Sequence, residues 1–158
     1  MEKECCPEFE PKRWDKKTFN WKKKNFMKES IPTFFHMPFP PMIGIKVKKM
    51  WKSIKEAKAC PPVKEWLLLF RDPTPFKSEM YMGATKQVKG ANNTTISGTF
   101  EAKVFDGPYN AIPKFMKEMN EYLSKKGKKM KDLYVHYAYC PKCAKKYGKN
   151  YMIFFAKV

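Results

Sequence analysis

The sharpest local motif for chemistry is a pair of cysteines separated by two residues, Cys140-Pro141-Lys142-Cys143. Two thiols at this spacing can close a redox disulfide or supply half of a tetrahedral zinc site. A structural zinc needs four ligands, and the sequence contains no second pair of this kind. The remaining candidate ligands are scattered along the chain: Cys5, Cys6, Cys60, His36 and His136. A zinc site, a redox pair and ordinary loop cysteines all stay open, and no metal site is predicted.

Other motifs that carry chemistry are missing. The seven glycines are scattered and form no phosphate-cradling loop, and no Gly-x-Ser-x-Gly nucleophile turn occurs. We therefore expect no cofactor, and motifs alone name no catalytic residue. His136 alternates to the side of its predicted strand opposite Tyr137, which favours a structural histidine over a catalytic base.

The formal net charge is +18, from 33 Lys and Arg against 15 Asp and Glu. Such a field attracts anions in general, but the basic residues are spread along the chain, which favours a solvated surface over a dedicated nucleic-acid face. Any nucleic-acid binding is expected to be nonspecific. No apolar run approaches the roughly 20 residues of a membrane span, and residues 1–30 lack a secretory apolar stretch. With an odd number of cysteines, we expect reduced thiols, a cytoplasmic location, no membrane partner, and a monomer or weak dimer.

Hydrophobic periodicity predicts the elements that must position any site. Two amphipathic helices are predicted, one from Ile43 to Ala57 and one carrying Ile112 to Leu123 and ending at Gly127. The predicted strands, in chain order, are Thr33–Phe39, Trp66–Phe70, Met80–Val88, Thr95–Val104, Leu133–Tyr139 and Tyr151–Val158.

These elements recur in the same order in the two halves of the chain. Each half reads as a strand, a helix, a strand, a Pro-containing loop and a strand. The sequence thus predicts one α+β domain over residues 1–158, with βαββ repeats at 33–90 and 91–158 after an N-terminal extension, 1–32. Antiparallel pairing with both helices on one face would form a single core, and the seam between the halves would be a natural cleft.

With this order, the run from Thr99 to Tyr109, Thr-Phe-Glu-Ala-Lys-Val-Phe-Asp-Gly-Pro-Tyr, resembles the GyrI-like small-molecule-binding family over residues 33–158. The resemblance implies a stand-alone domain for a small hydrophobic or aromatic ligand, in xenobiotic sensing or sequestration, and a binding function is favoured over an enzyme. Many relatives carry a Glu two residues ahead of a Tyr in the strand before the second Pro loop. The matching positions here are Val135 and Tyr137, which puts cation binding and hydrolysis in doubt.

The resemblance also implies a ligand-lining set. If Val135 faces the cleft, alternation places its neighbours on the strand there too, together with the equivalent positions of the first half. The predicted ligand-binding residues are Leu67, Leu69, Arg71, Leu133, Val135, Tyr137, Tyr139 and, as part of an N-terminal lid, Trp21. Ordinary core packing is the alternative for all of them.

The resemblance also implies a second possible function, because some relatives are hydrolases that open strained cyclopropane-containing toxins. Tyr137 and Tyr139 would then polarise the substrate, and an acid would come from Glu65 or Glu101. Glu101 shares the polar side of its predicted strand, so we expect it to be exposed.

Residues 1–30 mix lysines with aromatic residues, and burial of each aromatic side chain is worth about 1.5–3 kcal/mol. We therefore expect this segment to pack onto the domain, with Trp14 or Trp21 near the mouth of the cleft. The spacing of seven between Trp14 and Trp21, and between Phe19 and Phe26, is compatible with a helix.

Overall fold

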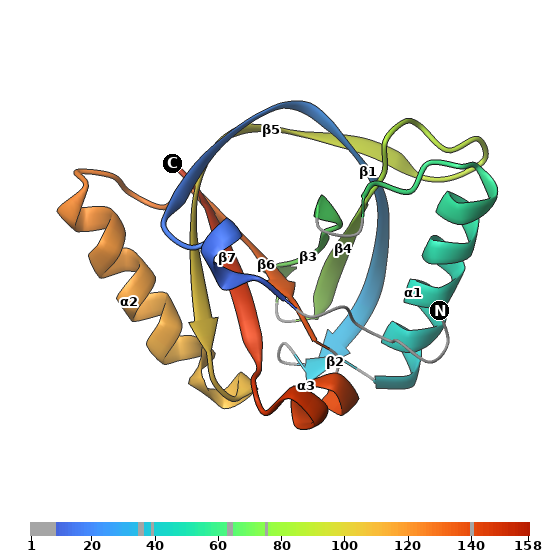
Figure 1. Cartoon of the computed structure of the whole chain (residues 1–158). Coiled ribbons are helices and arrows are strands. Elements are labelled where there is room, and N and C mark those ends of the chain that lie inside the picture. Colours follow the sequence, from blue (N-terminus) through green and yellow to red (C-terminus); the bar gives the residue numbers. More distant parts are fainter. Residues whose placement is uncertain (1–8, 35–36, 39, 63–64, 75, 140) are drawn as a thin grey trace. The chain divides into compact units, whose positions relative to one another are not determined.

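The computed structural model describes residues 9–34, 37–38, 40–62, 65–74, 76–139 and 141–158 (Figure 1). The chain divides into two compact units. The central unit is Lys22–Ser97, and the terminal unit combines Met1–Trp21 with Gly98–Val158. Two long strands, β1 (Lys17–Phe34) and β5 (Asn93–Asp106), contribute residues to both.

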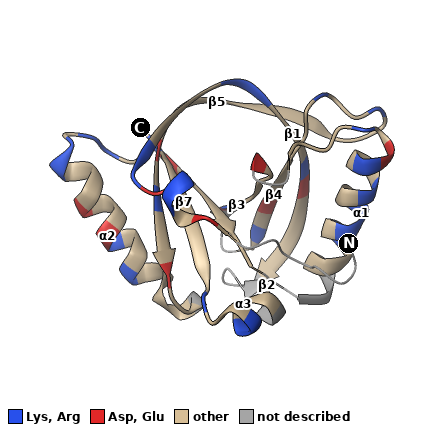
Figure 2. Cartoon of the chain, in the orientation of Figure 1, with Lys and Arg blue, Asp and Glu red and all other residues tan. Residues whose placement is uncertain are grey.

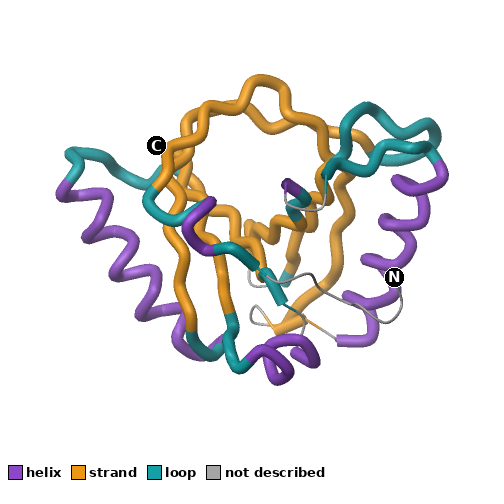
Figure 3. The backbone as a smooth tube through the Cα atoms, in the orientation of Figure 1, coloured by secondary structure: helices purple, strands orange, loops and turns teal. Residues whose placement is uncertain are grey.

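The central unit combines one helix with antiparallel strands (Figure 3). In chain order, its elements after β1 are β2 (Met37–Pro38), α1 (Pro40–Glu56), β3 (Leu68–Thr74) and β4 (Lys77–Gly83). Hydrogen bonds join the strands in the order β2-β1-β4-β3, and each of these pairings is antiparallel. This arrangement leaves one face of β4 toward α1 and the other face away from it.

The core of the central unit packs α1 against β1 and β4. The buried cluster consists of Met27, Ile31, Met50, Ile54, Ala59, Met80, Met82 and Val88. Met50 and Ile54 are one turn apart on α1, as expected for the apolar stripe of an amphipathic helix. Met80 and Met82 are two apart on β4, so both point to the helix side and the residues between them do not.

The terminal unit contains the other two α-helices of the described residues. Its elements are η1 (Pro11–Arg13), the start of β1, most of β5, η3 (Tyr109–Ala111), α2 (Ile112–Lys125), β6 (Asp132–Tyr137), α3 (Pro141–Tyr147) and β7 (Tyr151–Lys157). β7 lies between β6 and β5 and pairs antiparallel with both. Its core is formed by α2 and the strand face beneath it: Phe105, Phe115, Met119, Leu123, Val135, Met152, Phe154 and Ala156.

A glycine fixes how closely α2 approaches β5. Gly107 follows the last residue of β5, and a Cβ at this position would lie 2.8 Å from Cζ of Phe115. Phe115 also stacks on Phe105 of β5, with ring centroids 4.7 Å apart. Any larger residue at position 107 would displace the Phe115 ring. The turn after β5 and the packing of α2 therefore depend on each other.

Aromatic residues of the N-terminal segment cover the strand face of the terminal unit that points away from α2. Trp14 is 8% exposed, and its ring centroid lies 5.9 Å from that of Phe155 on β7. Trp21 lies 4.6 Å from Phe100 of β5 and 5.3 Å from Phe155. The expected packing of this segment onto the domain is therefore confirmed for its described residues, and its action as a lid stays a prediction.

The α+β class and the antiparallel pairing expected from the sequence are confirmed, while the duplication into repeats 33–90 and 91–158, and the placement of the helices on one common face, stay predictions. Two expectations about elements were wrong. Residues 17–26, where the aromatic spacing was compatible with a helix, belong to the strand β1, and Pro141–Tyr147 forms a third helix where a loop was expected. In the described part of the chain, no helix is long and apolar enough to cross a membrane.

Candidate functional site

The face of the central unit that points away from α1 carries an unusual set of charged side chains. In the strand register, Arg71 of β3 lies opposite Glu79 of β4, and Lys28 of β1 lies opposite Tyr81 of β4. Cross-strand partners point to the same side of a sheet. The strands therefore bring a carboxylate, a phenol, a guanidinium and an ammonium group together on one surface.

Glu79 is the centre of this cluster. Its Oε1 accepts hydrogen bonds from Oη of Tyr81 at 2.8 Å and from Nη1 of Arg71 at 3.0 Å. Its Oε2 lies 3.2 Å from Nζ of Lys28 and 3.9 Å from Nζ of Lys77. The Glu79 side chain is only 8% exposed, whereas those of Lys28 and Arg71 are 31% and 30% exposed. The carboxylate is thus enclosed, and its two closest cations reach solvent.

The protonation of Glu79 follows from these contacts. Burial alone would raise the pKa of its carboxyl group, but hydrogen bonds from Tyr81, Lys28 and Arg71, together with the charge of Lys28, outweigh burial and hold that pKa below its usual value. Glu79 is therefore ionised at neutral pH. A carboxylate buried in the same place without these partners would tend to be protonated, because an unpaired buried charge is costly.

Apolar side chains surround this charged cluster. Leu69 lies opposite Tyr81 in the register and is fully buried. The ring of Phe26 packs edge-on against that of Tyr81, with centroids 6.3 Å apart, and Nζ of Lys28 lies 5.7 Å from the Tyr81 centroid. These buried side chains hold the ring of Tyr81, and through it the Glu79 carboxylate, in place.

The structure brings part of the predicted ligand-lining set to this cluster. Leu69 and Arg71 of β3 lie on the same face as Glu79. Leu67 comes just before β3, is 2% exposed, and its carbonyl accepts a hydrogen bond from the backbone of Gly83. Their contact with a ligand stays a prediction, but Arg71 is placed beside a carboxylate that the sequence reasoning did not consider.

The second-half members of the predicted set lie elsewhere. Val135 belongs to the core beneath α2, and Leu133 and Tyr137 pack against that core, so these three point toward the helix. The opposite face of β6 carries Tyr134, whose ring contacts Phe100, and His136, which is 5% exposed. Leu133, Val135 and Tyr137 thus occupy core positions, which was the alternative interpretation for them. Their contact with a ligand stays a prediction.

Tyr139 lies just beyond the end of β6 and is 2% exposed. Its Oη accepts a hydrogen bond from the backbone N–H of Phe9 at 2.8 Å, and its ring stacks on Tyr147 of α3 with centroids 4.6 Å apart. Tyr139 therefore joins the N-terminal segment to α3. Trp21, the predicted lid residue, lies in the aromatic cluster on β5 and β7 described above.

The cysteine motif gives no metal site among the described residues. Cys143 is a buried free thiol on α3, and Cys60 is an exposed one. Cys140, Cys5, Cys6 and His36 lie outside the residues that the structure describes. Within the described ranges, no three His, Cys, Asp or Glu side chains are close enough to hold a metal ion together.

Basic residues are spread over both units. Figure 2 shows Lys and Arg on all three helices and on strands and loops, interrupted by acidic residues on α2. This distribution matches the spread of charge along the sequence. The expected absence of specific nucleic-acid binding stays a prediction.

Comparison with known proteins places the chain in a family. The family model described as bacterial hydrolase matches residues 1–158, the whole chain. The chain belongs to the bacterial hydrolase family. A search of curated proteins found no match. The matching model is not a GyrI-like one, so the GyrI-like resemblance stays a prediction.

In a member of a hydrolase family, glutamate carboxylates are candidates for the general base that activates water. Glu65, one acid suggested from the sequence, is exposed. Glu101, the other, was expected to be exposed, and this was wrong, because it is fully buried on the face of β5 toward α2. It is held by Lys126, by Nζ of Lys128 at 2.7 Å and by Oγ1 of Thr18 at 2.8 Å. Glu101 thus fastens three segments of the terminal unit together.

The sequence analysis did not identify Glu79 of this bacterial hydrolase family member as a candidate site residue. The strand predicted there began at Met80, one residue after Glu79, so the acid lay outside every predicted element. The signal was nevertheless present: Glu79-Met80-Tyr81 has an acid two residues ahead of a tyrosine, on one side of a strand. This is the spacing that the resemblance led us to seek at Val135 and Tyr137.

Proposed function

We propose that this chain is a hydrolase for a small, largely apolar molecule, and that Glu79 is its catalytic carboxylate. The observation that carries the proposal is the enclosed Glu79 carboxylate, which is in contact with a tyrosine hydroxyl and two partly exposed cations. Membership of the bacterial hydrolase family supports the same class of reaction. The binding of a small hydrophobic ligand, which the sequence favoured, would then be substrate binding, the first step of this reaction.

In the proposed reaction, Glu79 takes a proton from the water that attacks the electrophilic carbon of the substrate. The bond from this carbon to the leaving atom breaks, and Glu79 returns the proton to that atom, which restores the carboxylate. A carboxylate with a lowered pKa is a weak base while its donors remain in place. An oxygen of the substrate that draws Arg71 and Lys28 toward itself would weaken their hold on Glu79 and raise the basicity of the carboxylate. The same cations then stabilise negative charge as it develops on the substrate oxygen. Tyr81 keeps the carboxylate oriented.

The substrate class follows from the surroundings of Glu79. The partly exposed cations favour an electrophilic group that gains negative charge on oxygen, and the family resemblance implies an apolar body. Esters, lactones and epoxides fit this description. The GyrI-like resemblance adds strained cyclopropane-containing compounds to the same panel.

The first test is hydrolysis of such a panel by the wild-type chain and by Glu79→Gln. The amide keeps the size of the side chain but cannot accept the proton, so we expect the turnover rate to fall by about 10²–10⁴-fold. Glu56→Gln is the matched control, because Glu56 is an exposed acid at the end of α1. Tyr81→Phe removes one hydrogen bond to Glu79 and should cause a smaller loss.

Circular dichroism and thermal unfolding must show that Glu79→Gln is folded before the rates are compared. A folded Glu79→Gln chain with the wild-type rate would contradict the proposal. So would a wild-type chain that hydrolyses none of the panel faster than buffer.

A further inference from the structure

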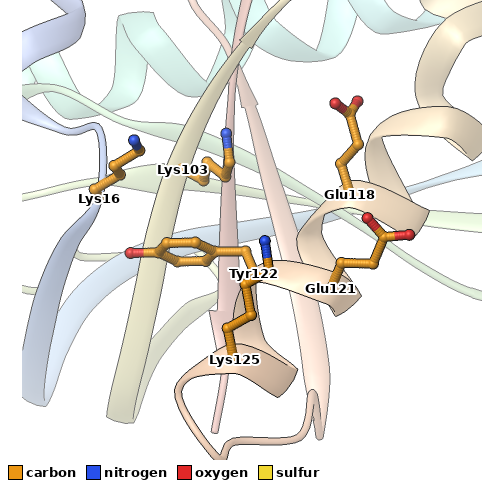
Figure 4. Close-up of a pocket in the computed structure, with 6 residues that line it drawn as sticks. All are labelled: Lys16, Lys103, Glu118, Glu121, Tyr122 and Lys125. Carbon is orange, nitrogen blue, oxygen red and sulfur yellow. The ribbon is translucent and has the colours of Figure 1, made fainter.

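The terminal unit has a pocket of its own on the outer side of β5. Its volume is about 280 Å³, and it is lined by Lys16, Lys103, Glu118, Glu121, Tyr122 and Lys125 (Figure 4). Lys16 comes just before β1, Lys103 lies on β5, and the other four lie on α2. The pocket shares no residue with the Glu79 cluster. Its volume lies just below the roughly 300–1,000 Å³ of most ligand pockets, which limits a ligand to about the size of an amino acid.

Charged groups of both signs line this pocket. In Figure 4 the carboxylates of Glu118 and Glu121 and the ammonium group of Lys125 lie on one side of the Tyr122 ring, Lys16 lies on the other side, and Lys103 lies above the ring. Glu118, Glu121, Tyr122 and Lys125 form one stripe of α2, because residues three and four apart are neighbours on a helix. Among the described residues, none of the five charged side chains of the pocket forms an ion pair.

The backbone holds Lys16 in an unusual conformation at this place. Its φ is +57°, in the left-handed region that costs a residue other than glycine on the order of 1 kcal/mol. The preceding residue fixes the segment to β5, because Oδ1 of Asp15 accepts a hydrogen bond from the backbone of Val104 at 3.0 Å. Trp14, before it, is buried. The fold thus maintains a strained residue whose side chain lines the pocket.

The Tyr122 ring is fixed as well. It packs against the core beneath α2, and Nζ of Lys126 lies 5.3 Å from its centroid. An aromatic ring offers a flat apolar contact for the body of a ligand. The pocket therefore combines lysine ammonium groups, two carboxylates and an aromatic surface.

We propose that this pocket binds a small zwitterion of amino-acid type. The carboxylate of the ligand lies toward Lys16 and Lys103, its ammonium group lies toward Glu118 and Glu121, and its apolar part contacts Tyr122. A simple anion would meet the two carboxylates, and a simple cation would meet the three lysines, so each loses part of the attraction that a zwitterion keeps. This binding is separate from the hydrolysis proposed at Glu79.

Three matched compounds test the proposal: L-phenylalanine, 3-phenylpropionate, which lacks its amine, and phenethylamine, which lacks its carboxylate. Isothermal titration calorimetry or NMR titration on the full chain measures each affinity. We expect L-phenylalanine to bind at least tenfold more tightly than either of the other two, and its affinity to fall as salt is added. Equal affinities for the three compounds, or no binding of L-phenylalanine at millimolar concentration, would overturn the proposal.

Variants locate the site. Lys103→Ala and Glu121→Gln should each weaken L-phenylalanine binding about tenfold, because each removes the partner of one ligand charge. Lys114→Ala is the matched control, since Lys114 is exposed on α2 and does not line the pocket. Wild-type affinity in Lys103→Ala and Glu121→Gln would overturn the assignment. Glu79→Gln should bind L-phenylalanine as the wild type does, so the pocket and the hydrolase proposal can fail independently.

Discussion

Glu79 and Glu101 are both buried glutamates with lysine partners, yet their surroundings differ. Glu79 contacts a tyrosine hydroxyl and an arginine, and lies on the strand face away from α1. Glu101 contacts Thr18 and two lysines of the segment that follows α2, and is fully buried. The contacts of Glu101 join parts of the chain that are far apart in sequence, which favours a role in stability rather than in catalysis.

We predict that Glu101→Gln lowers the free energy of unfolding by roughly 3 kcal/mol, the lower end of the range for removing one partner of a buried ion pair. The lower end is expected because both lysine side chains are 35% exposed and can be rehydrated. Urea denaturation measures the change, with Glu56→Gln as the control. A change within 0.5 kcal/mol, roughly that of an ordinary surface substitution, would show that the cluster is not stabilising.

The same residue makes stability depend on pH. Burial would raise the pKa of Glu101, but hydrogen bonds from Lys126, Lys128 and Thr18 lower it further than burial raises it, so the pKa in the folded state lies below the ordinary value of 4.5. The unfolded chain therefore binds the proton first as pH falls. The stabilisation is complete above pH 4.5 and disappears as pH falls through the folded-state pKa. Glu101→Gln should flatten this part of the stability curve.

The burial of Glu101 could not be predicted from its neighbours in sequence. Strict alternation places it with Thr99 and Lys103, and the pattern reads as a polar strand face. The lysines that cover it come after α2, where Gly127 turns the chain with a φ of +69°. A local pattern indicates which side of a strand a residue occupies, but not what packs on that side.

At the level of elements, periodicity predicted α1, α2 and the strands β3 to β7 within a few residues, because their apolar faces pack against a core. Two elements were missed. In β1 the spacing of seven between Phe19 and Phe26 was interpreted as compatible with a helix, whereas Phe19 packs against Phe155 and Phe26 against Tyr81, and Lys23 between them has a φ of +48° that interrupts regular strand alternation. In α3 the proline was interpreted as opening a loop, whereas it occupies the first helical position, where its missing N–H costs nothing.

The turn between β5 and α2 gives a test of packing. We predict that Gly107→Ala destabilises the protein by about 1–3 kcal/mol, because the new methyl group would lie 2.8 Å from the ring of Phe115 and the ring must move. Thermal or urea unfolding measures the effect. Gly44→Ala is the opposite control: Gly44 lies in α1 with nothing within 4 Å of the added Cβ, and alanine should stabilise the helix by about 0.5–1 kcal/mol. Equal effects at the two sites would contradict the packing argument.

At the scale of the whole molecule, the N-terminal segment supplies a strand and core residues to the central unit and an aromatic cluster to the terminal unit. Residues 26–32 pair with β4, and Phe26 and Met27 are 1% and 5% exposed. We predict that deletion of residues 1–30 abolishes cooperative unfolding, because it removes a strand of the central unit and the aromatic cluster of the terminal unit. Circular dichroism during heating measures this, with Lys22→Ala, an exposed position of β1, as the control.

A deletion variant that unfolds cooperatively near the wild-type temperature would show that residues 1–30 are dispensable for the fold. The lid could then be tested directly by comparing ligand affinities. If cooperative unfolding is lost, a lid must be tested by substitutions such as Trp21→Ala, which leave the strand in place.

The division of β1 between the units also sets an order of events during biosynthesis. Trp14, Phe19 and Trp21 leave the ribosome long before Phe155, against which all three pack. The central unit can complete its own pairings while synthesis continues, since its strands are contiguous from residue 22. Until Phe155 has been made, these three aromatic residues are exposed to water in a lysine-rich segment. Their lysine neighbours keep this waiting segment soluble and repel other nascent chains of the same kind.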